Sequence, residues 1–233
     1  RRWHALGTRR CVALRNTTPR APPRRHVPLG ASLGVGVGGG VRVLPVLLSP
    51  KVRLVEGFVS AEEAAHVIEL GMPFMSRSLA GGRTESIRTS TTAMLPPSDP
   101  VVRRITERAA YLTGYPYGNV EPLQLLKYTA GQKYEPHFDF GEACDFEENM
   151  DKGHRHVTML VYLNSVPDEW EGWTTFPKLN LKMSPRANAA VVFNDCHANG
   201  QEDQRTLHGG SPPTNGTKMA INIWIRAGTW RRG

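Results

Sequence analysis

Near Val120 the chain changes from helical patterning to a series of short apolar segments separated by turn residues, and this change constrains the fold most. Apolar segments of about four to eight residues between turns are typical of strands. We expect strands at residues 124–128, 137–140, 157–164, 189–194, 206–208 and 219–226. Several strands that follow two helices predict helices packed on a curved antiparallel sheet or barrel.

Two amphipathic helices are expected before these strands. Ser60 and Glu63 have the spacing of a capping box, so the first helix should begin after Ser60 and end near Gly71. The second helix should cover residues 99–113 and end at Gly114. Its apolar stripe consists of Val102, Ile105, Ala109 and Leu112. Residues 43–55 read as one or two strands that precede both helices.

The positive charge of the chain is concentrated at its N-terminal end. The net charge is +8, and residues 1–55 hold eleven of the 29 Lys and Arg residues but no Asp or Glu, which leaves 18 basic against 21 acidic residues. Such an Arg-rich, Pro/Gly-punctuated segment cannot form a packed core. We expect residues 1–42 to be a basic tail, either disordered or left from an organelle-targeting segment. Residues 43–229 are expected to form one domain.

Composition also excludes several classes of function. Enzymes that act on nucleic acids place Lys and Arg on the folded body, and here the body is mildly acidic, so a DNA or RNA substrate is not expected. No run of about eighteen apolar residues exists, so no membrane span is predicted. The three cysteines, Cys11, Cys144 and Cys196, form no C-x-x-C motif and indicate no zinc ribbon. One bridge between Cys144 and Cys196 stays open.

A candidate metal site begins with His137 and Asp139. On a strand, residues i and i+2 face the same way, so this imidazole and carboxylate would project to one side. His208, in the Thr-Leu-His-Gly-Gly segment 206–210, is suited to supply a third ligand. Two histidines and one carboxylate form the facial triad of non-haem Fe(II) oxygenases, which leaves positions for a cosubstrate and dioxygen. The alternative for an isolated H-x-D is a polar surface strand.

Lys218 lies at the start of the apolar segment 219–224. A lysine that points inward from an apolar strand needs an anionic partner. The distal carboxylate of 2-oxoglutarate would provide one. The alternative is a solvent-facing strand end after the Asn-Gly turn at 215–216.

Several short motifs occur together in one order, and this set is far more specific than any one of them. They are the segments 121–128, 137–139, 155–164, 174–177 and 206–212, followed by Lys218. In this order and spacing, residues from about 43 to 228 resemble the catalytic domain of prolyl 4-hydroxylases of the collagen, plant and algal type. The resemblance implies a mainly β fold with flanking helices, a double-stranded β-helix of the jelly-roll or cupin-like kind.

The same resemblance implies an activity and the residues that carry it. The activity is that of a procollagen-proline 4-dioxygenase-like enzyme, which uses Fe(II), 2-oxoglutarate and O₂ to convert peptidyl proline to 4-hydroxyproline, with succinate and CO₂ as co-products. Ascorbate (vitamin C) would keep the iron reduced. His137, Asp139 and His208 match the iron ligands. Lys218, assisted by Tyr128 and Thr174, matches the anchor of the 2-oxoglutarate distal carboxylate. Arg155 and Trp224 match positions near the peptide substrate.

Some positions depart from the family pattern. The chain reads Glu-Gly-Trp at 171–173 where a triplet such as Gly-Gly-Glu is usual, and the preceding loop 166–170 is about two residues longer. These departures leave substrate identity open, so an oxygenase acting on another residue or a small molecule is one alternative. A catalytically silent barrel that binds a partner is another. A proline-rich peptide or protein substrate and the endoplasmic reticulum or secretory pathway are implied by the family, while the oligomeric state is not predicted.

Overall fold

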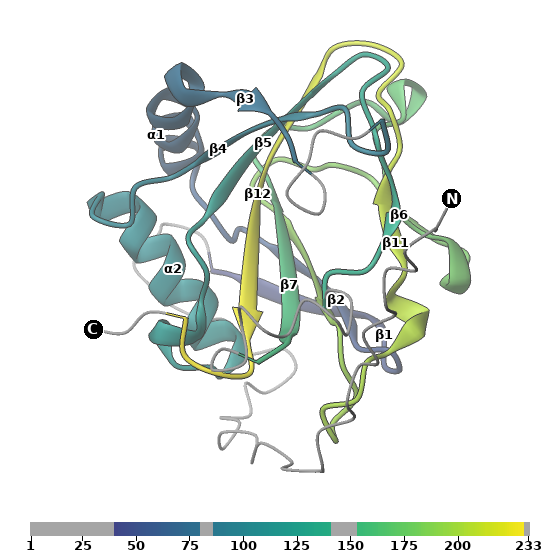
Figure 1. Ribbon diagram of the computed structural model, residues 1–233. Coiled ribbons are helices and arrows are strands. Elements are labelled where there is room, and N and C mark those ends of the chain that lie inside the picture. The colour runs from purple at the N-terminus through teal and green to yellow at the C-terminus, as the bar shows by residue number, and fades with distance from the viewer. Residues whose placement is uncertain (1–39, 80–85, 141–152, 231–233) are drawn as a thin grey trace, which may run out of the picture.

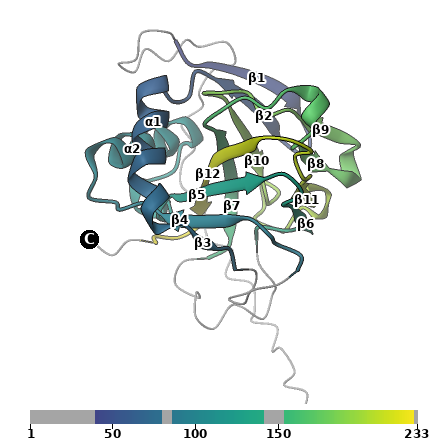
Figure 2. The same ribbon diagram turned by 90° about the horizontal axis from the view of Figure 1, so that it is seen from above.

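A computed structural model describes residues 40–79, 86–140 and 153–230. These residues form two antiparallel sheets that face each other, with two α-helices on the outer side of the larger sheet (Figures 1 and 2). The strand order of the larger sheet is β1 (Arg42–Leu47), β2 (Val52–Glu56), β10 (Ala190–Asn194), β7 (Arg155–Tyr162), β12 (Thr217–Arg226), β5 (Gln124–Thr129), β4 (Thr91–Met94) and β3 (Ser76–Arg77). The order in the smaller sheet is β6 (Tyr134–His137), β11 (His208–Gly210), β8 (Thr174–Phe176) and β9 (Leu181–Met183).

The two helices begin and end where their capping residues predict. Helix α1 (Ala61–Gly71) has a complete capping box, in which the Ser60 hydroxyl accepts from the Glu63 amide at 3.1 Å and the Glu63 carboxylate accepts from the Ser60 amide at 3.1 Å. Helix α2 (Pro100–Thr113) ends at Gly114, whose φ of 77° is left-handed. Five short 3₁₀ helices complete the described elements: Met72–Phe74, Tyr117–Asn119, Asp168–Trp170, Pro177–Leu179 and Gln204–Thr206.

The larger sheet is buried on both faces, and β12 shows how the sequence divides between them. Alternate residues of a strand face opposite sides. Met219, Ile221, Ile223 and Ile225 belong to the core under the helices, together with the apolar stripe of α2. Lys218, Ala220, Asn222 and Trp224 have the opposite parity, and Ala220 belongs to a second core between the two sheets. Lys218 and Asn222 therefore face the space between the two sheets.

Two expected strands differ from those in the structure. The expected strand 137–140 is wrong, because β6 covers Tyr134–His137 and ends at the first of those residues. Its partner β11 begins at His208, which pairs with His137, so the residues beyond His137 have no strand to pair with. The expected strand 206–208 is displaced for a related reason, since Thr206 ends a 3₁₀ helix and pairing starts at His208.

Some expectations fall on residues that are not described. The basic tail lies almost entirely within residues 1–39, which are outside the described ranges. Cys144 is also outside the described ranges, so its pairing with Cys196 stays a prediction. Cys196 is a buried free thiol that donates to the Arg155 carbonyl at 3.6 Å. Among the described helices, none is both long and apolar enough to cross a membrane.

Candidate active site

Three side chains from the smaller sheet and its margin meet between the two sheets. His137, Asp139 and His208 offer ligand atoms that all lie within 4.8 Å of one another. The histidines come together because they are cross-strand partners on β6 and β11, with ring centroids 4.5 Å apart. Asp139 follows the end of β6 and turns back, with Oδ1 3.6 Å from His137 Nε2 and Oδ2 3.4 Å from His208 Nε2.

Backbone carbonyls fix which nitrogen each histidine presents. His137 Nδ1 lies 2.8 Å from the Glu135 carbonyl oxygen, and His208 Nδ1 lies 3.0 Å from the Thr206 carbonyl oxygen. A carbonyl oxygen only accepts, so both Nδ1 atoms must donate. The Nε2 atoms are left to face each other and Asp139, as in metal-ligating histidines whose second nitrogen is held by the protein.

The triad has the donor set of a non-haem Fe(II) site, namely two imidazoles and one carboxylate. Burial, and then the neighbouring His208, lower the pKa of His137 to about 3, which keeps it in the neutral form that ligates metal. Burial lowers the pKa of His208, but the Asp139 carboxylate outweighs that effect and the net shift is upward. A metal ion would therefore compete with a proton for His208. The residues present fit an Fe(II) ion.

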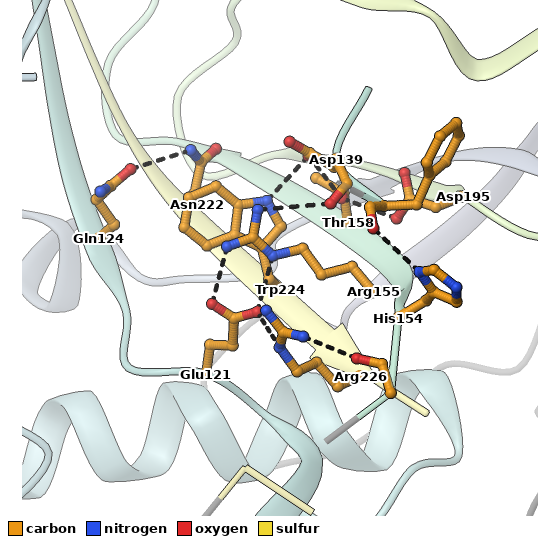
Figure 3. Close-up of polar contacts among 12 residues, drawn as sticks. Glu121, Gln124, Asp139, His154, Arg155, Thr158, Asp195, Asn222, Trp224 and Arg226 are labelled. Atoms are coloured by element: carbon orange, nitrogen blue, oxygen red, sulfur yellow. Dashed lines mark hydrogen bonds and ion pairs between the residues drawn. The ribbon is translucent and has the colours of Figure 1, made fainter. Parts of the chain in front are cut away.

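Asp139 is buried and surrounded by donors. Its Oδ2 accepts from the Thr158 hydroxyl at 2.7 Å and from the Trp224 indole Nε1 at 2.9 Å (Figure 3). Burial by itself raises the pKa of Asp139, but His208 and His137 hold it well below its usual range. This carboxylate is thus ionised and fixed in orientation before any metal binds.

Lys218 is another buried charged group in the space between the sheets. It is 2% exposed, and its Nζ donates to the Gly172 carbonyl at 2.8 Å and lies 5.5 Å from the ring centres of Tyr128 and Tyr162. None of the described carboxylates forms a salt bridge with it, and burial lowers the pKa of its ammonium to about 7. An ammonium in this position lacks a counter-charge.

The triad and Lys218 line one pocket. Its described lining comprises Leu126, Tyr128, Tyr134, His137, Asp139, Thr158, Leu160, Thr174, Phe193, His208, Gly209, Gly210, Lys218 and Asn222. The predicted Tyr128 and Thr174 are both in this lining and both buried. Thr174 accepts a hydrogen bond from the Tyr162 hydroxyl at 2.7 Å, and burial raises the pKa of Tyr128. The predicted cosubstrate residues therefore gather at one end.

Arg155 and Trp224 lie beside the pocket rather than in its lining. The Arg155 guanidinium pairs with both oxygens of Glu121, at 2.7 and 2.9 Å, and lies 3.8 Å from the Trp224 ring centre. Arg226 donates to the same Glu121 carboxylate at 2.7 Å (Figure 3). The structure thus places both residues in a network behind Asp139, and their role toward substrate stays a prediction.

Sequence reasoning gave no role to several polar residues of this region, among them Thr158, Tyr162, Asp195 and Asn222. Asn222 has the same strand parity as Lys218, so inward alternation from Lys218 would have identified it. Thr158 is a lone hydroxyl at an inward position of an apolar strand, which is a weaker signal. Asp195 follows the end of β10, where a sequence gives no indication that a carboxylate is buried.

Comparisons with known proteins agree on the class of protein that this fold and site define. The family model described as the 2OG-Fe(II) oxygenase superfamily matches residues 123–226. A solved structure, the 2OG complex of the viral collagen prolyl hydroxylase from Paramecium Bursaria Chlorella virus-1, superposes with a TM-score of 0.61 at 26% identity, covering 75% of this chain and 95% of that one. The barrel is therefore a jelly roll of the 2OG oxygenase type, and the chain is a 2-oxoglutarate-dependent dioxygenase.

Proteins of similar sequence place the chain in one family of 2-oxoglutarate-dependent dioxygenases. Probable prolyl 4-hydroxylase 7 of Arabidopsis thaliana is 34% identical over 215 residues, covering 82% of this chain and 67% of the relative. Prolyl 4-hydroxylase subunit alpha-3 of Rattus norvegicus is 37% identical over 188 residues, covering 76% of this chain but only 34% of that longer subunit. The chain belongs to the prolyl 4-hydroxylase family.

Proposed function

We propose that this protein hydroxylates peptidyl proline to 4-hydroxyproline, with conversion of 2-oxoglutarate and O₂ to succinate and CO₂. The observation that carries the proposal is the pocket itself, which has a metal-ligand triad at one end and an uncompensated buried ammonium at the other. A dicarboxylate cosubstrate would supply the missing negative charge and span toward the metal. The names of the relatives supply the substrate class, peptidyl proline.

His137 and His208 would hold Fe(II) through Nε2, and Asp139 through Oδ1. Oδ1 is the oxygen left available, because Oδ2 already accepts from Thr158 and Trp224. When bound, the iron with its two cosubstrates supplies the oxidising chemistry that breaks the substrate C–H bond. The contribution of the chain is to hold three neutral or anionic donors in fixed orientations.

Lys218, Tyr128 and Thr174 would bind the distal carboxylate of 2-oxoglutarate. The Lys218 ammonium supplies charge, and the hydroxyls at the same end supply directional hydrogen bonds. Apolar side chains of the pocket lining, such as Leu126 and Phe193, would exclude water from the pocket. Arg155 and Trp224 would border the peptide, with the Glu121 carboxylate holding the guanidinium in place.

The direct test is succinate release that depends on peptide. The protein, supplied with Fe(II), ascorbate and 2-oxoglutarate, is offered proline-rich peptides and the same peptides with alanine in place of proline, with His208→Ala as the inactive control. Succinate coupled to a gain of one oxygen on proline, located by mass spectrometry, supports the proposal. Oxygen on another residue would favour a different 2-oxoglutarate oxygenase, and no succinate at all would favour a silent binding module.

Ascorbate would sustain turnover, and a reaction that stops after a few cycles without it would support this role. The family resemblance favours the endoplasmic reticulum or secretory pathway as the site of action. The alternative is another organelle to which the basic segment 1–42 would target the protein. Imaging of the tagged full-length protein, and its mass in solution, would determine the destination and the subunit number.

A further inference from the structure

The Thr158 hydroxyl lies between two carboxyl groups. Its Oγ1 is 2.7 Å from Asp139 Oδ2 on one side and 2.9 Å from Asp195 Oδ2 on the other (Figure 3). Thr158 is on β7 and is 1% exposed, and Asp195 follows β10, the neighbouring strand, and is fully buried. Three oxygen atoms thus form a chain that leads from the interior to the proposed metal ligand.

This chain of oxygens needs two hydrogens, and threonine has one. A hydroxyl donates one hydrogen bond, while an ionised carboxylate only accepts. If Thr158 donated to Asp195, its own oxygen would face Asp139 Oδ2 at 2.7 Å with lone pair against lone pair. If Thr158 donates to Asp139, a second hydrogen is required between Thr158 and Asp195. Only Asp195 can carry that hydrogen.

The surroundings of Asp195 are those of a neutral acid. Its Oδ1 has no hydrogen-bond partner within the described part of the chain, and its Oδ2 contacts the Thr158 hydroxyl. An ionised carboxylate with one oxygen unpaired and fully buried is far costlier than a neutral carboxyl in the same place. Burial, and then the negative charge of Asp139, raise the pKa of Asp195 well above its usual range.

Backbone contacts hold Asp195 in this position. Its amide donates to the His156 carbonyl at 3.0 Å, and its own carbonyl accepts from the Asp203 amide at 2.9 Å. The side chain is therefore presented to Thr158 by main-chain pairing on both sides. The backbone hydrogen bonds of Asp195, and not only its side-chain rotamer, thus align its carboxyl group with the Thr158 hydroxyl.

We propose that Asp195 is a positioning residue which, as a neutral carboxylic acid, donates to Thr158 and so directs the threonine hydroxyl onto Oδ2 of Asp139. With Thr158 and Trp224 both donating to Oδ2, Oδ1 is left to ligate the metal. The inference rests on the proposed metal site and adds to it a relay of two residues, Thr158 and Asp195, that acts on the metal through Asp139. Partners of metal ligands typically change metal affinity by about 10- to 100-fold.

Co(II) binding to the metal-free protein, without 2-oxoglutarate or peptide, measures this role directly. Asp195→Asn keeps a permanent N–H donor toward Thr158, so its Co(II) affinity should stay within about twofold of the parent. Asp195→Ala and Thr158→Val remove the relay and should weaken binding by roughly tenfold or more. Thr106→Val is the matched control, because Thr106 is equally buried and bonds the Val102 carbonyl in α2, far from the triad.

Infrared spectroscopy supplies a second reading that does not depend on metal. The metal-free protein at neutral pH should show the carbonyl stretch of a protonated carboxylic acid, and that band should disappear in Asp195→Asn while it persists in Thr106→Val. Absence of the band, or Co(II) binding by Asp195→Asn as weak as that by Asp195→Ala, would overturn the proposal. Parent-like Co(II) affinity in Asp195→Ala would do the same.

One further variant separates this inference from the proposed function. His208→Ala should lose Co(II) binding if the triad is the metal site at all. If it does, and the Thr158 and Asp195 variants bind like the parent, only the relay is wrong. If His208→Ala binds Co(II) like the parent, the metal site itself is wrong.

Discussion

The two ends of the pocket are built on opposite principles. At the triad end, Asp139 is a buried charge with several partners: two donors on Oδ2 and two imidazoles within 3.6 Å of its oxygens. At the other end, Lys218 is a buried charge with one carbonyl and two aromatic rings around it, and no described carboxylate pairs with it. The pKa of each group lies below its ordinary value, but for opposite reasons. The imidazoles of His208 and His137 favour the charged form of Asp139, whereas burial disfavours the charged form of Lys218.

This difference indicates what each end is for. An acid that is held ionised and oriented by the protein is assembled before its metal arrives, so metal binding requires little rearrangement. A lysine whose burial opposes its charge is costly in the free protein, and a bound anion removes that cost. The triad end therefore defines geometry, and the lysine end provides binding energy for one particular ligand.

The largest expected effect is loss of the triad. His208→Ala removes a ligand and also the imidazole nearest Asp139 Oδ2, so metal affinity and turnover should fall by more than the roughly 100-fold that loss of a supporting partner costs. Fe(II)-dependent succinate formation and Co(II) binding measure the two quantities. Retained turnover would show that the preassembled end is not the reaction centre.

Lys218→Met is the next largest change and acts at the other end. Loss of a buried charge partner typically costs about 2–5 kcal/mol, so the KM for 2-oxoglutarate should rise by roughly 100-fold while Co(II) affinity stays nearly constant. Lys182→Met is the matched control, because Lys182 is exposed and its Nζ lies over the Trp173 ring at 4.1 Å. Without ligand, Lys218→Met should also melt at a higher temperature than the parent. A lower melting temperature would contradict the idea of an uncompensated charge.

The pKa of Lys218, about 7, predicts a pH dependence of the same end. In the free protein this value lies below the 10.5 of an ordinary lysine, so the unfolded chain binds more protons between about pH 7 and 10.5. The free energy of unfolding should therefore gain a contribution that rises with pH across this window. Binding of 2-oxoglutarate should take up a proton at pH 8 and less below pH 7. Calorimetry in buffers of different ionisation enthalpy measures the uptake, and Lys218→Met should abolish it.

The same contrast explains which parts of the site the sequence could predict. The structure brings together His137, Asp139, His208 and Lys218, which the sequence singles out because each stands in a local pattern with its own chemistry. Strand parity was correct for β12 but not for β6, where the strand ends at His137 and Asp139 reaches the triad from beyond it. Strand pairing decided that boundary, and a pairing partner 71 residues further along the chain is not visible in the local sequence.

Supporting residues were the least predictable. Asp195 is remote in sequence from Asp139, and only the packing of β10 beside β7 brings it to Thr158. The capping residue Ser60, by contrast, acts within three residues of itself and was identified from the sequence together with the helix that it begins. Interactions between residues close in sequence can therefore be predicted from the sequence. Hydrogen-bond networks around a site depend on tertiary contacts and cannot be predicted in the same way.

A smaller effect is expected from Trp224→Phe, which removes one of the two donors to Asp139 Oδ2. The ring remains available to Arg155, so the change isolates the indole N–H. Hydrogen bonds to charged groups contribute about 1.5–3 kcal/mol, and Co(II) affinity should fall by about tenfold. Trp173→Phe serves as the control, since Trp173 is outside the described pocket lining. Equal Co(II) affinities of Trp224→Phe and Trp173→Phe would show that the hydrogen bond from Trp224 to Asp139 does not contribute to metal binding.

The smallest effect concerns the backbone beside the lysine end. Glu171, which precedes the Gly172 carbonyl that receives the Lys218 ammonium, has φ 59° and ψ −123°, a conformation that favours glycine. Backbone strain of this kind costs about 1–3 kcal/mol, and a new glycine loses about 0.5–1 kcal/mol in chain entropy, so Glu171→Gly should stabilise the protein by about 1 kcal/mol. A melting temperature higher by roughly 2–4 °C is the expected reading.

Asn180→Gly is the matched control, because Asn180 has φ 48° and ψ 42°, which asparagine tolerates, and its gain in stability should be smaller. A fall in melting temperature for Glu171→Gly alone would mean that the Glu171 side chain, rather than its backbone, supports the turn that holds Gly172 against Lys218.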